Sequence, residues 1–424
     1  MRIFLSLSFI IIYLGAFAQR DSLRSYYEAG VSAYRAKKYS LFLECFKKAN
    51  EIRPNHPTIT YNLASAYAIN EKVEASFMVI QQLINMNTNQ LEVIKKDSDF
   101  RSIVELQGFK DLEQYAEQKS SLISESRMDN SIRLDSIHIE GIAYNPAKNE
   151  YYLGAVNTRS LFSYSDTGLS AIINFRDIPN VFSILGVAYH ALSNSIWLCT
   201  SALPQMSDYS ETKSGYSSII EYSLDQKRVI TEILKRGASA FGDLTISKNG
   251  RVFVSDGLSN KIFEVQSGDT VLSTFVNLSS EAFNLQGLAL SPNEECLFVA
   301  DYISGIFKIN TATKSKTKIA LPKNVSPKGI DGLYFYRNSL LAIQNGTTPF
   351  RVMKLNLDAK KENVTDAEIF DQARPELGEP TQGVIRDDRF VYIANSPWSH
   401  YTENLILNAE QDLLLLSHPL KADH

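Results

Sequence analysis

The sequence predicts a short helical domain followed by a six-bladed β-propeller. One observation is a short phrase, a glycine at the head of an alternating apolar run, which returns six times between residues 139 and 385. A second is that each repeat holds several short alternating runs separated by turn residues, which is typical of strands. A third is that residues 22–118 follow a helical period instead. The marker glycines of the six copies are Gly141, Gly186, Gly242, Gly287, Gly332 and Gly383, which lie 45, 56, 45, 45 and 51 residues apart.

Each repeat has the same internal order. The glycine-marked strand is followed by a polar turn, a second apolar strand, a third strand and a more variable fourth strand. A glycine at the head of the first strand fits a crowded position where backbones converge near a central channel. We expect the propeller to span residues 131–420, with the first blade starting near Ser131 and the last closing with residues 412–417.

Residues 22–118 form the predicted helical domain, and residues 119–130, rich in Ser, Glu and Lys, form the predicted linker. Small, aromatic and helix-ending residues recur at fixed places, and a second copy of the pattern runs from about residue 61 to residue 86. The pattern resembles the tetratricopeptide repeat in two units, with short helices expected at 97–100 and 108–112 to seal the open end. The resemblance implies a groove for a protein or peptide partner; the alternative is a stabilising or spacing element. The first unit is marked by Gly30, Tyr34, Tyr39, Phe46, Ala49 and Pro54.

The first 18 residues are predicted to be a secretory signal peptide. Met1-Arg2 precedes an apolar run at 3–16 and the small-residue site Ala16-Phe17-Ala18. The apolar run is too short for a membrane span. We therefore expect an exported protein, periplasmic or extracellular, with no membrane span after cleavage; a buried N-terminal helix is the alternative.

Charge and cysteine content exclude several classes of function. A net charge of −4 and a pI near 6.0 give no basic footprint for a nucleic acid partner. The three cysteines, Cys45, Cys199 and Cys296, are too few and too far apart for a disulfide framework or a zinc site, so we predict buried thiols.

Two sets of residues are expected at the mouth of the propeller. In a propeller, two kinds of loop open on the same face: those that enter the innermost strands and those that join the second and third strands. Residues before the marker glycines should therefore face the central funnel. Residues that end the second strands should form a ring around it. Carboxylates and amides gathered at one funnel fit a hard cation such as Ca²⁺. The funnel set is Glu140, Leu185, Phe241, Gln286, Asp331 and Gln382, and the ring set is Asn157, Thr200, Asp256, Asp301, Asn345 and Asn395.

Three phrases carry a resemblance to a known family. Residues 140–143, 286–292 and 331–333 resemble the senescence marker protein, gluconolactonase and luciferin-regenerating enzyme family, and shade into the NHL-type propellers. The resemblance covers about Ser131 to Leu416. It implies a six-bladed propeller with a central divalent cation, in a family whose enzymes open lactones or hydrolyse related esters.

Carried over by position, the resemblance makes Glu140 and Asp331 metal-binding carboxylates, and Gln286 completes the predicted metal site. The sequence departs from the family at two places. Gln286 stands where the family has the shorter Asn, and Gly242 stands where a blade-three Asn is expected. The adjacent Asp243 could compensate for Gly242 if its side chain turns inward, but it points away from the funnel if strand alternation holds.

Asp331 is the candidate catalytic residue. A bound cation would polarise a lactone carbonyl and lower the pKa of water, with Asp331 as metal ligand or base. His400 is a lesser candidate for the base, whereas His190 and His138 are expected to lie away from the mouth. Alternatively, Asp331 only forms a turn with the glycine that follows it, and Asp256 and Asp301 are expected to be such strand-end turn residues.

The predicted small-molecule site adds aromatic and amide side chains. The long insertion at 201–217 in the second blade is expected to overhang the mouth, or else to be a disordered excursion. Together with Trp398 and Tyr401, this insertion would form a wall for a sugar or another small ligand. The predicted ligand-binding residues are Gln382, Trp398, Tyr401, Asn395 and Asn345.

Three functions follow as hypotheses. The first is an exported ligand-binding propeller with a helical interaction module. The second is a calcium-dependent lactonase or esterase that acts at the propeller mouth. The third is a scaffold in which both halves contact proteins. The carboxylates Glu140 and Asp331 favour the enzyme, whereas Gly242 and Gln286 favour binding without catalysis.

Overall fold

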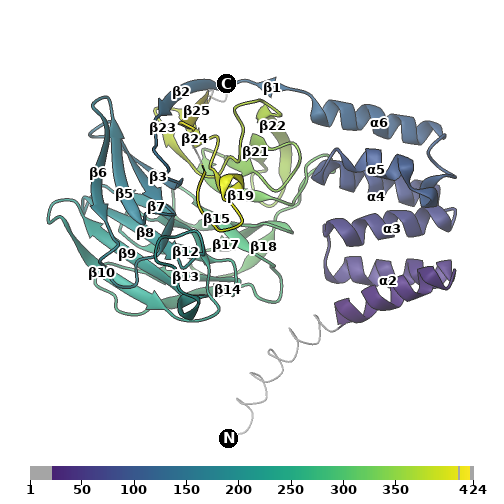
Figure 1. The fold of residues 1–424 in the computed structure, drawn as a ribbon, viewed down its shortest axis with the longest axis horizontal. Coiled ribbons are helices and arrows are strands. Elements are labelled where there is room, and N and C mark those ends of the chain that lie inside the picture. The colour runs from purple at the N-terminus through teal and green to yellow at the C-terminus, as the bar shows by residue number, and fades with distance from the viewer. Residues whose placement is uncertain (1–21, 409–410, 421–424) are drawn as a thin grey trace, which may run out of the picture. The chain divides into compact units, whose positions relative to one another are not determined.

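A computed structural model describes residues 22–408 and 411–420 and confirms the predicted fold class, with helices first and six antiparallel sheets after them (Figure 1). The described residues divide into two compact units. One holds the helices through Ser121 together with Asn324–Lys328 and Thr347–Pro349, and the other holds the remaining residues. The predicted signal peptide at 1–18 lies outside the described residues. Among the helices described, none is both long and apolar enough to cross a membrane.

The helices of the first unit pack through the small and aromatic residues that marked the sequence pattern. A Cβ on Gly30 would lie 2.6 Å from the Phe46 ring, so glycine permits the close approach of the first two helices. Asp99 accepts hydrogen bonds from Tyr34 at 2.8 Å and Ser65 at 2.6 Å, which ties the sealing segment to both helix pairs. The assignment of the helices in this unit to the tetratricopeptide family stays a prediction. The helical segments are 22–35, α2 (Tyr39–Ile52), α3 (Pro57–Ile69), α4 (Val73–Met86), α5 (Gln90–Lys96), the 3₁₀ turn η1 (Ser98–Phe100) and α6 (Gln107–Ser120).

Residues 119–130, predicted to be a linker, are instead part of regular structure. They end α6, form β1 (Ile123–Ser124), and supply most of β2 (Arg127–Ile132). β1 pairs with the outer strand of the fifth sheet, with Ile123 opposite Gln372. The reason for the difference is that outer strands expose unpaired backbone groups, and these residues satisfy them.

The ring of sheets is closed by β2, so the expected start near Ser131 was wrong. The strand order of the last sheet is β2-β25-β24-β23, and Arg127 pairs with Ser417. Ser131 therefore belongs to the last sheet, and the first sheet begins at β3 with Ile139. Pairing the first strand of the ring with the last sheet joins the two ends of the propeller through backbone hydrogen bonds.

The six sheets otherwise follow the chain in order. The first sheet holds β3 (Ile139–Asn145), β4 (Glu150–Ala155), β5 (Ser160–Ser165) and β6 (Gly168–Asn174), and the second sheet holds β7 (Ser183–His190), β8 (Ser195–Ser201), β9 (Ser217–Ser223) and β10 (Arg228–Lys235). The third sheet holds β11 (Phe241–Ile246), β12 (Val252–Asp256), β13 (Lys261–Val265) and β14 (Ser273–Asn277), and the fourth sheet holds β15 (Leu285–Leu290), β16 (Cys296–Asp301), β17 (Gly305–Asn310) and β18 (Lys316–Lys318). The fifth sheet holds β19 (Ile330–Tyr336), β20 (Ser339–Gln344), β21 (Arg351–Leu357) and β22 (Val364–Gln372), and the sixth sheet holds β23 (Gly383–Arg386), β24 (Arg389–Ile393) and β25 (Leu413–Pro419) together with β2.

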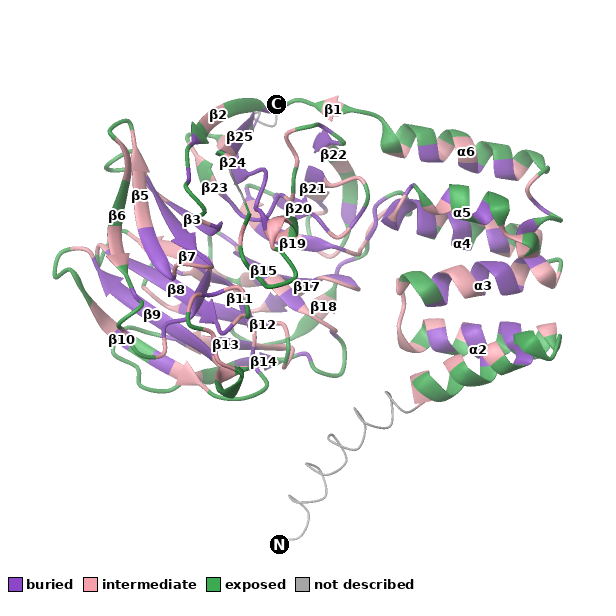
Figure 2. Cartoon of the chain, viewed as in Figure 1, coloured by how far each residue is buried: buried purple, intermediate pink, exposed green. Residues whose placement is uncertain are grey.

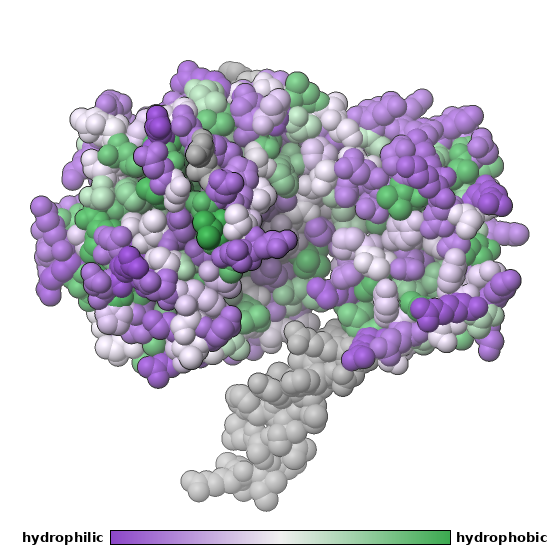
Figure 3. Space-filling model, viewed as in Figure 1, coloured by the Kyte–Doolittle hydropathy of each residue, from purple (hydrophilic) through white to green (hydrophobic). Residues whose placement is uncertain are grey.

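The innermost strands adjoin one another around the channel in the order β3, β7, β11, β15, β19 and β23, and β23 adjoins β3 again. Apolar side chains of neighbouring sheets pack between them; one such cluster joins Tyr152 of β4 to Ile196 of β8. Figure 2 shows the buried residues running along these strands, while the loops at their ends are exposed. On the face drawn in Figure 3, hydrophilic and apolar residues are interspersed over the surface.

A β-bulge interrupts the alternation of side chains in β3, β7, β11, β15 and β19 at the position of the marker glycine. In β15, Gln286 and Gly287 stand together opposite Ala300. A Cβ on Gly287 would lie 2.3 Å from the carbonyl oxygen of Asp331 on the next innermost strand. The bulge therefore brings neighbouring backbones together and turns the residue before the glycine toward the channel.

The third repeat shifts this pattern by one residue. Phe241 pairs with Asp256 in β11 as Leu285 pairs with Asp301 in β15. Gly242 therefore occupies the place of Gln286, and Asp243 occupies the place of the marker glycine. The choice of Gly242 as the marker was wrong, because backbone pairing and not the glycine itself fixes the register.

The close approach of the innermost strands predicts the effect of a single methyl group. Gly287→Ala should lower the free energy of unfolding by about 3 kcal/mol or more, because its Cβ would meet backbone atoms that have no rotamer with which to yield. Urea unfolding of the full-length protein measures this change.

The matched control is Gly168→Ala, where a Cβ would meet no atom within 4 Å. Its cost comes only from the positive φ of +98° and should be about 1 kcal/mol. Equal losses for the two variants would contradict the account of the crowded channel.

Candidate functional site

All six residues predicted to face the funnel line one central cavity of about 270 Å³. Gly242, Asn345 and Trp398 also line it, together with Glu379, Tyr302 and Asn284. Among the described residues that line this cavity, none is Lys, Arg or His. The cavity is therefore acidic, and the predicted metal ligands Glu140, Gln286 and Asp331 share it.

Glu140 is held in place by two donors from the segment after β24. Ser396 Oγ donates to Glu140 Oε2 at 2.6 Å, and Trp398 Nε1 donates to the same oxygen at 3.0 Å. Burial raises the pKa of Glu140 to about 7, although both hydrogen bonds act in the opposite direction. Trp398, predicted as a ligand contact, thus lines the cavity and also orients a carboxyl group within it.

His138 lies behind Glu140, a position that sequence reasoning missed. Its Nε2 is 2.8 Å from Ser396 Oγ and its Nδ1 is 2.9 Å from the Tyr401 hydroxyl. Because Ser396 donates its proton to Glu140, it accepts from His138 Nε2, and Nδ1 accepts from Tyr401. Burial lowers the pKa of His138 to about 3, so its 3.6 Å approach to Glu140 is not an ion pair.

Asp331 is oriented by an amide from the end of β20. Asn345 Nδ2 donates to Asp331 Oδ2 at 2.7 Å, and Tyr302 donates its hydroxyl proton to Asn345 Oδ1 at 3.0 Å. Burial and then the charge of Glu140 raise the pKa of Asp331 to about 8, while the hydrogen bond from Asn345 lowers it. Asp331 and Gly332 form the bulge of β19, so this pair is not a chain-reversing turn.

Glu379 is a third acidic residue of the cavity that sequence reasoning missed. It precedes β23 in the segment Gly378–Pro380. Burial, followed by the charge of Glu140, raises the pKa of Glu379 to about 7. The signal in the sequence is its position in the loop that enters an innermost strand, a few residues before the marker glycine Gly383.

The two departures from the family pattern complement each other. A Cβ on Gly242 would lie 2.6 Å from Gln286 Oε1, so the longer amide side chain extends over the space that glycine leaves. Gln286 Nε2 donates to Asn284 Oδ1 at 3.0 Å, which fixes the orientation of the amide. Gln286 therefore places its carbonyl oxygen beside Gly242, in the lining of the cavity.

Asp243 was expected to point away from the channel, and that expectation was wrong. Its carboxylate accepts backbone hydrogen bonds from Leu288 at 3.1 Å and Leu244 at 2.8 Å, and Gln382 Nε2 lies 3.4 Å from it. The bulge in β11 breaks the alternation on which the expectation rested. Burial raises the pKa of Asp243 to about 7. Asp243 thus links the third, fourth and sixth blades beside the cavity.

Most of the predicted ring set anchors loops and does not face the cavity. Asp256 accepts from the backbone of Ala240, and Asp301 accepts from that of Phe283 and Asn284, which confirms the prediction that these two acids are strand-end turn residues. Asn157 and Thr200 hold the backbone of His138 and Phe182 in the same way. Of the ring set, only Asn345 lines the central cavity.

Asn395 and Tyr401 do not line the central cavity, contrary to the predicted ligand site. The Asn395 amide donates to Asp412 and accepts from the backbone of Leu414, so both its polar atoms hold the chain. Tyr401 lines a second cavity, described below. His400, which ends the 3₁₀ turn η3 (Trp398–His400), lines neither cavity.

The insertion at 201–217 is ordered in the structure. Ser201 and Leu203 line the central cavity. Met206 packs with Phe182 and Ala202 in a small apolar cluster of its own. The insertion therefore forms part of the mouth, as predicted, and the alternative of a disordered excursion was wrong.

The donor chemistry of the cavity suits a hard cation, since carboxylate and amide oxygens are the groups that Ca²⁺ binds. In residues 22–408 and 411–420, no three His, Cys, Asp or Glu side chains lie close enough together to hold a metal ion. The charge of Glu140 acts on the carboxyl of Asp331, and the amides of Gln286 and Asn345 line the same cavity. All three cysteines are free thiols; Cys45 and Cys199 are buried as predicted, and Cys296 is half-buried.

Comparison with known proteins identifies the fold only. A scan against protein-family models and a search of curated proteins gave no match. The fold is similar to a gluconolactonase from Xanthomonas campestris, at 13% identity over 71% of this chain and 92% of that one, with a TM-score of 0.48. It is also similar to regucalcin, a calcium-binding protein from Agrobacterium tumefaciens, at 11% identity over 70% of this chain and 93% of that one, with a TM-score of 0.47. A third similar structure is that of luciferin-regenerating enzyme, at 9% identity over 67% of this chain and 92% of that one, with a TM-score of 0.46. These structural neighbours belong to the family whose likeness was predicted from the sequence.

The raised pKa values predict how stability depends on pH when divalent cations are removed. Below the ordinary pKa values of 3.8 and 4.5, Asp331 and Glu140 are protonated in both folded and unfolded states. Above them the unfolded state ionises while the folded state keeps its protons. The free energy of unfolding should therefore fall from about pH 5 until the pH passes the folded-state pKa values, about 7 for Glu140 and about 8 for Asp331.

Urea unfolding in a chelator between pH 5 and pH 8 measures this fall. Asp331→Asn, which has no proton to lose, should show a smaller fall than the unmodified protein. If the free energy of unfolding changes equally with pH in both proteins, or rises with pH in this window, the raised pKa assigned to Asp331 is contradicted.

Proposed function

We propose that this protein is an exported binding protein whose central cavity takes a small polar ligand together with a divalent cation such as Ca²⁺. The observation that supports this most strongly is the gathering of Glu140, Asp331 and Glu379 around one cavity with no basic residue among the described lining residues. Burial raises the pKa values of these carboxyls to between about 7 and about 8, and the charge of Glu140 adds to the effect at Asp331 and Glu379. A cation would favour the ionised form of each group, so its binding would relieve the cost of placing them together.

Glu140 and Asp331 would hold the cation, and the amide oxygen of Gln286 would be the third predicted ligand. Each side chain is already oriented by neighbours: Glu140 by Ser396, and Asp331 by Asn345. Calcium takes six to eight oxygens at flexible distances, so water and ligand oxygens would complete its shell. When bound, the cation would supply an anchor for a carbonyl, hydroxyl or carboxylate oxygen of the ligand.

The remaining wall of the cavity fits the organic part of a ligand. Trp398 and Tyr302 give aromatic surface, and Gln382 adds an amide. A cavity of about 270 Å³ that combines many polar side chains with aromatic and aliphatic ones suits a small polar ligand. Export rests on the sequence of residues 1–18 and is part of the proposal.

Calcium is expected to stabilise the full-length protein by mass action. A calcium concentration one hundred times the dissociation constant should raise the free energy of unfolding by about 2.7 kcal/mol. Thermal unfolding at pH 7 with calcium or with a chelator measures this. Asp331→Asn should abolish the shift, because it removes one of the two carboxylates that would hold the cation.

The control is Asp366→Asn, the same chemical change on the exposed outer strand β22. It should keep the full calcium shift. A shift that survives in Asp331→Asn and disappears in Asp366→Asn would place the cation elsewhere, and no shift in any protein would reject the cation.

Hydrolysis of a lactone or ester is the second candidate function. It is favoured by Asp331, whose pKa of about 8 in a cavity shared with Glu140 would fall when a cation binds and leave a carboxylate able to accept a proton. Turnover of a panel of lactones that requires calcium and is lost in Asp331→Asn would support the enzyme. Calcium-dependent stabilisation without turnover would support binding alone.

The helical unit adds a possible protein or peptide partner to the proposal. Leu41, Met78 and Val93 are at least half exposed on its helices. Exposed apolar side chains of this kind are available for contact with another chain, although single ones are common on any surface. A scaffold role for the whole chain, in which both halves bind proteins, stays a prediction.

A further inference from the structure

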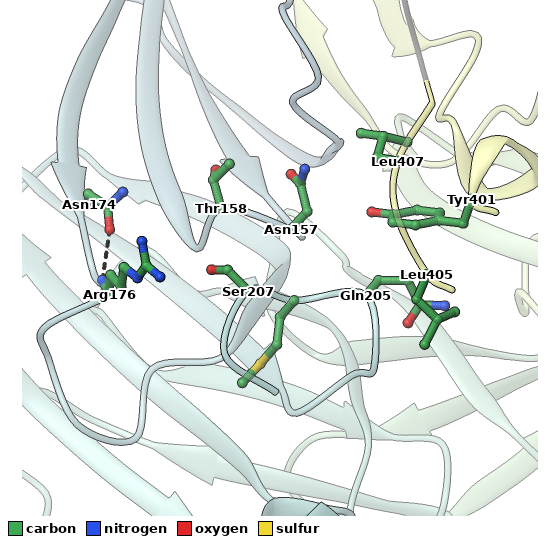
Figure 4. A pocket seen from close by; sticks show the side chains of 10 residues that line it. Asn157, Thr158, Asn174, Arg176, Gln205, Ser207, Tyr401, Leu405 and Leu407 are labelled. Carbon is green, nitrogen blue, oxygen red and sulfur yellow. Dashed lines mark hydrogen bonds between the residues drawn. The ribbon is translucent and has the colours of Figure 1, made fainter. Parts of the chain in front are cut away.

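A second cavity, of about 340 Å³, opens beside the central one and shares no lining residue with it. We propose that this second cavity binds a neutral sugar or a similar polyol, which goes beyond the function proposed for the central cavity. Three segments far apart in the sequence form it (Figure 4). They are Asn157–Thr158 with Asn174 and Arg176 from the first blade, Gln205–Ser207 from the insertion, and Tyr401, Leu405 and Leu407 from the loop before β25.

The polar groups of the second cavity are almost all neutral. Asn157, Thr158 and Gln205 bring amides and a hydroxyl to its wall. Arg176 is its one charged lining residue, and its guanidinium is paired with Asp208 through hydrogen bonds of 2.6 and 3.0 Å. A charged ligand would have to compete with this pair, whereas a neutral ligand would not.

Two polar side chains of the insertion are available to a ligand. In the described part of the chain, the Gln205 amide and the Ser207 hydroxyl make no hydrogen bond, yet their backbone is firmly held. Ser207 N donates to the carbonyl oxygen of Asn157 at 2.8 Å, and Met206 between them is 3% exposed. An ordered backbone that carries unpaired amide and hydroxyl groups is suited to bind hydroxyl groups with little loss of entropy.

The opposite wall is aromatic and aliphatic. The hydroxyl of Tyr401 is fixed by its 2.9 Å contact with His138 Nδ1, so the position of its ring is set. Tyr401 and Leu407 face each other across a β-bridge, and Leu407 also lines the cavity. An aromatic ring opposite amides and hydroxyls matches the two kinds of surface of a sugar, whose C–H groups pack on rings while its hydroxyls form hydrogen bonds.

Leu405 gives an independent reason to expect a ligand here. Its φ is +58°, in the left-handed region that favours glycine, and its side chain is 42% exposed. It occupies a tight turn in which Thr402 accepts from the Leu405 backbone and donates to that of Ile406. A large apolar residue is unfavourable at such a position, both for the backbone and for solvation. Contact with a bound molecule would account for a leucine where glycine would suit the turn.

The proposal is tested by titrating the full-length protein with a panel of neutral mono- and disaccharides, including glucose and maltose, by calorimetry or ligand-observed NMR. At least one sugar should bind saturably. Gln205→Ala should weaken that binding about fivefold, the loss of one neutral hydrogen bond. Leu405→Gly should also weaken binding, while its melting temperature stays equal or rises because glycine suits the positive φ.

A central-cavity variant, Asp331→Asn, separates this proposal from the function proposed above. It should leave sugar binding to the second cavity unchanged. If sugar binding is instead lost in Asp331→Asn and kept in Gln205→Ala and Leu405→Gly, the sugar occupies the central cavity and the second site is rejected. Failure of every sugar to bind at tens of millimolar also overturns the second site and leaves the calcium experiment unaffected.

Discussion

The six innermost strands approach one another so closely around the channel that backbone atoms fill the space a side chain would need. At Gly287 a Cβ would lie 2.3 Å from the backbone of the next innermost strand, and at Gly332 it would lie 2.6 Å from the carbonyl oxygen of Thr381. The chain meets this constraint with a bulge, which adds a residue and breaks the alternation of side chains. In the fourth and fifth repeats this directs the residue before the glycine, Gln286 or Asp331, into the channel, and the central cavity is a consequence of how the ring closes.

This geometry concentrates acidic side chains where water and neutralising groups are few. Burial raises the pKa values of Glu140, Asp331 and Glu379, and the charge of Glu140 adds to this effect at Asp331 and Glu379. No described lining residue is basic. Glu140 and Asp331 are each oriented by a neutral donor, which fixes the position of the carboxyl group without neutralising its charge. Such an arrangement is unfavourable in isolation and becomes favourable when a cation or a positively charged group enters. The energetic cost of burying these carboxylates together is the physical basis of the proposed binding function.

The repeat of the marker phrase was sufficient to predict the fold and six of the residues that line the cavity, because backbone crowding requires glycine at a fixed place in each repeat. Features that depend on pairing between distant segments left no such mark. The turning of Asp243 toward the channel follows from a bulge that shifts the third repeat by one residue. The burial of His138 between Ser396 and Tyr401 depends on a segment more than 250 residues away. The closure of the last sheet by β2 likewise joins the two ends of the propeller.

Carboxyl-resolved NMR titration of the full-length protein tests the account most directly. In a chelator, the account expects a small set of carboxyl carbons to titrate far above the others, with midpoints near 7 for Glu140 and Glu379 and near 8 for Asp331. Addition of calcium should move these midpoints into the acidic range by stabilising the ionised forms. If every carboxyl titrates near its ordinary value, or if calcium leaves the raised midpoints in place, the shared acidic cavity does not bind cations as described.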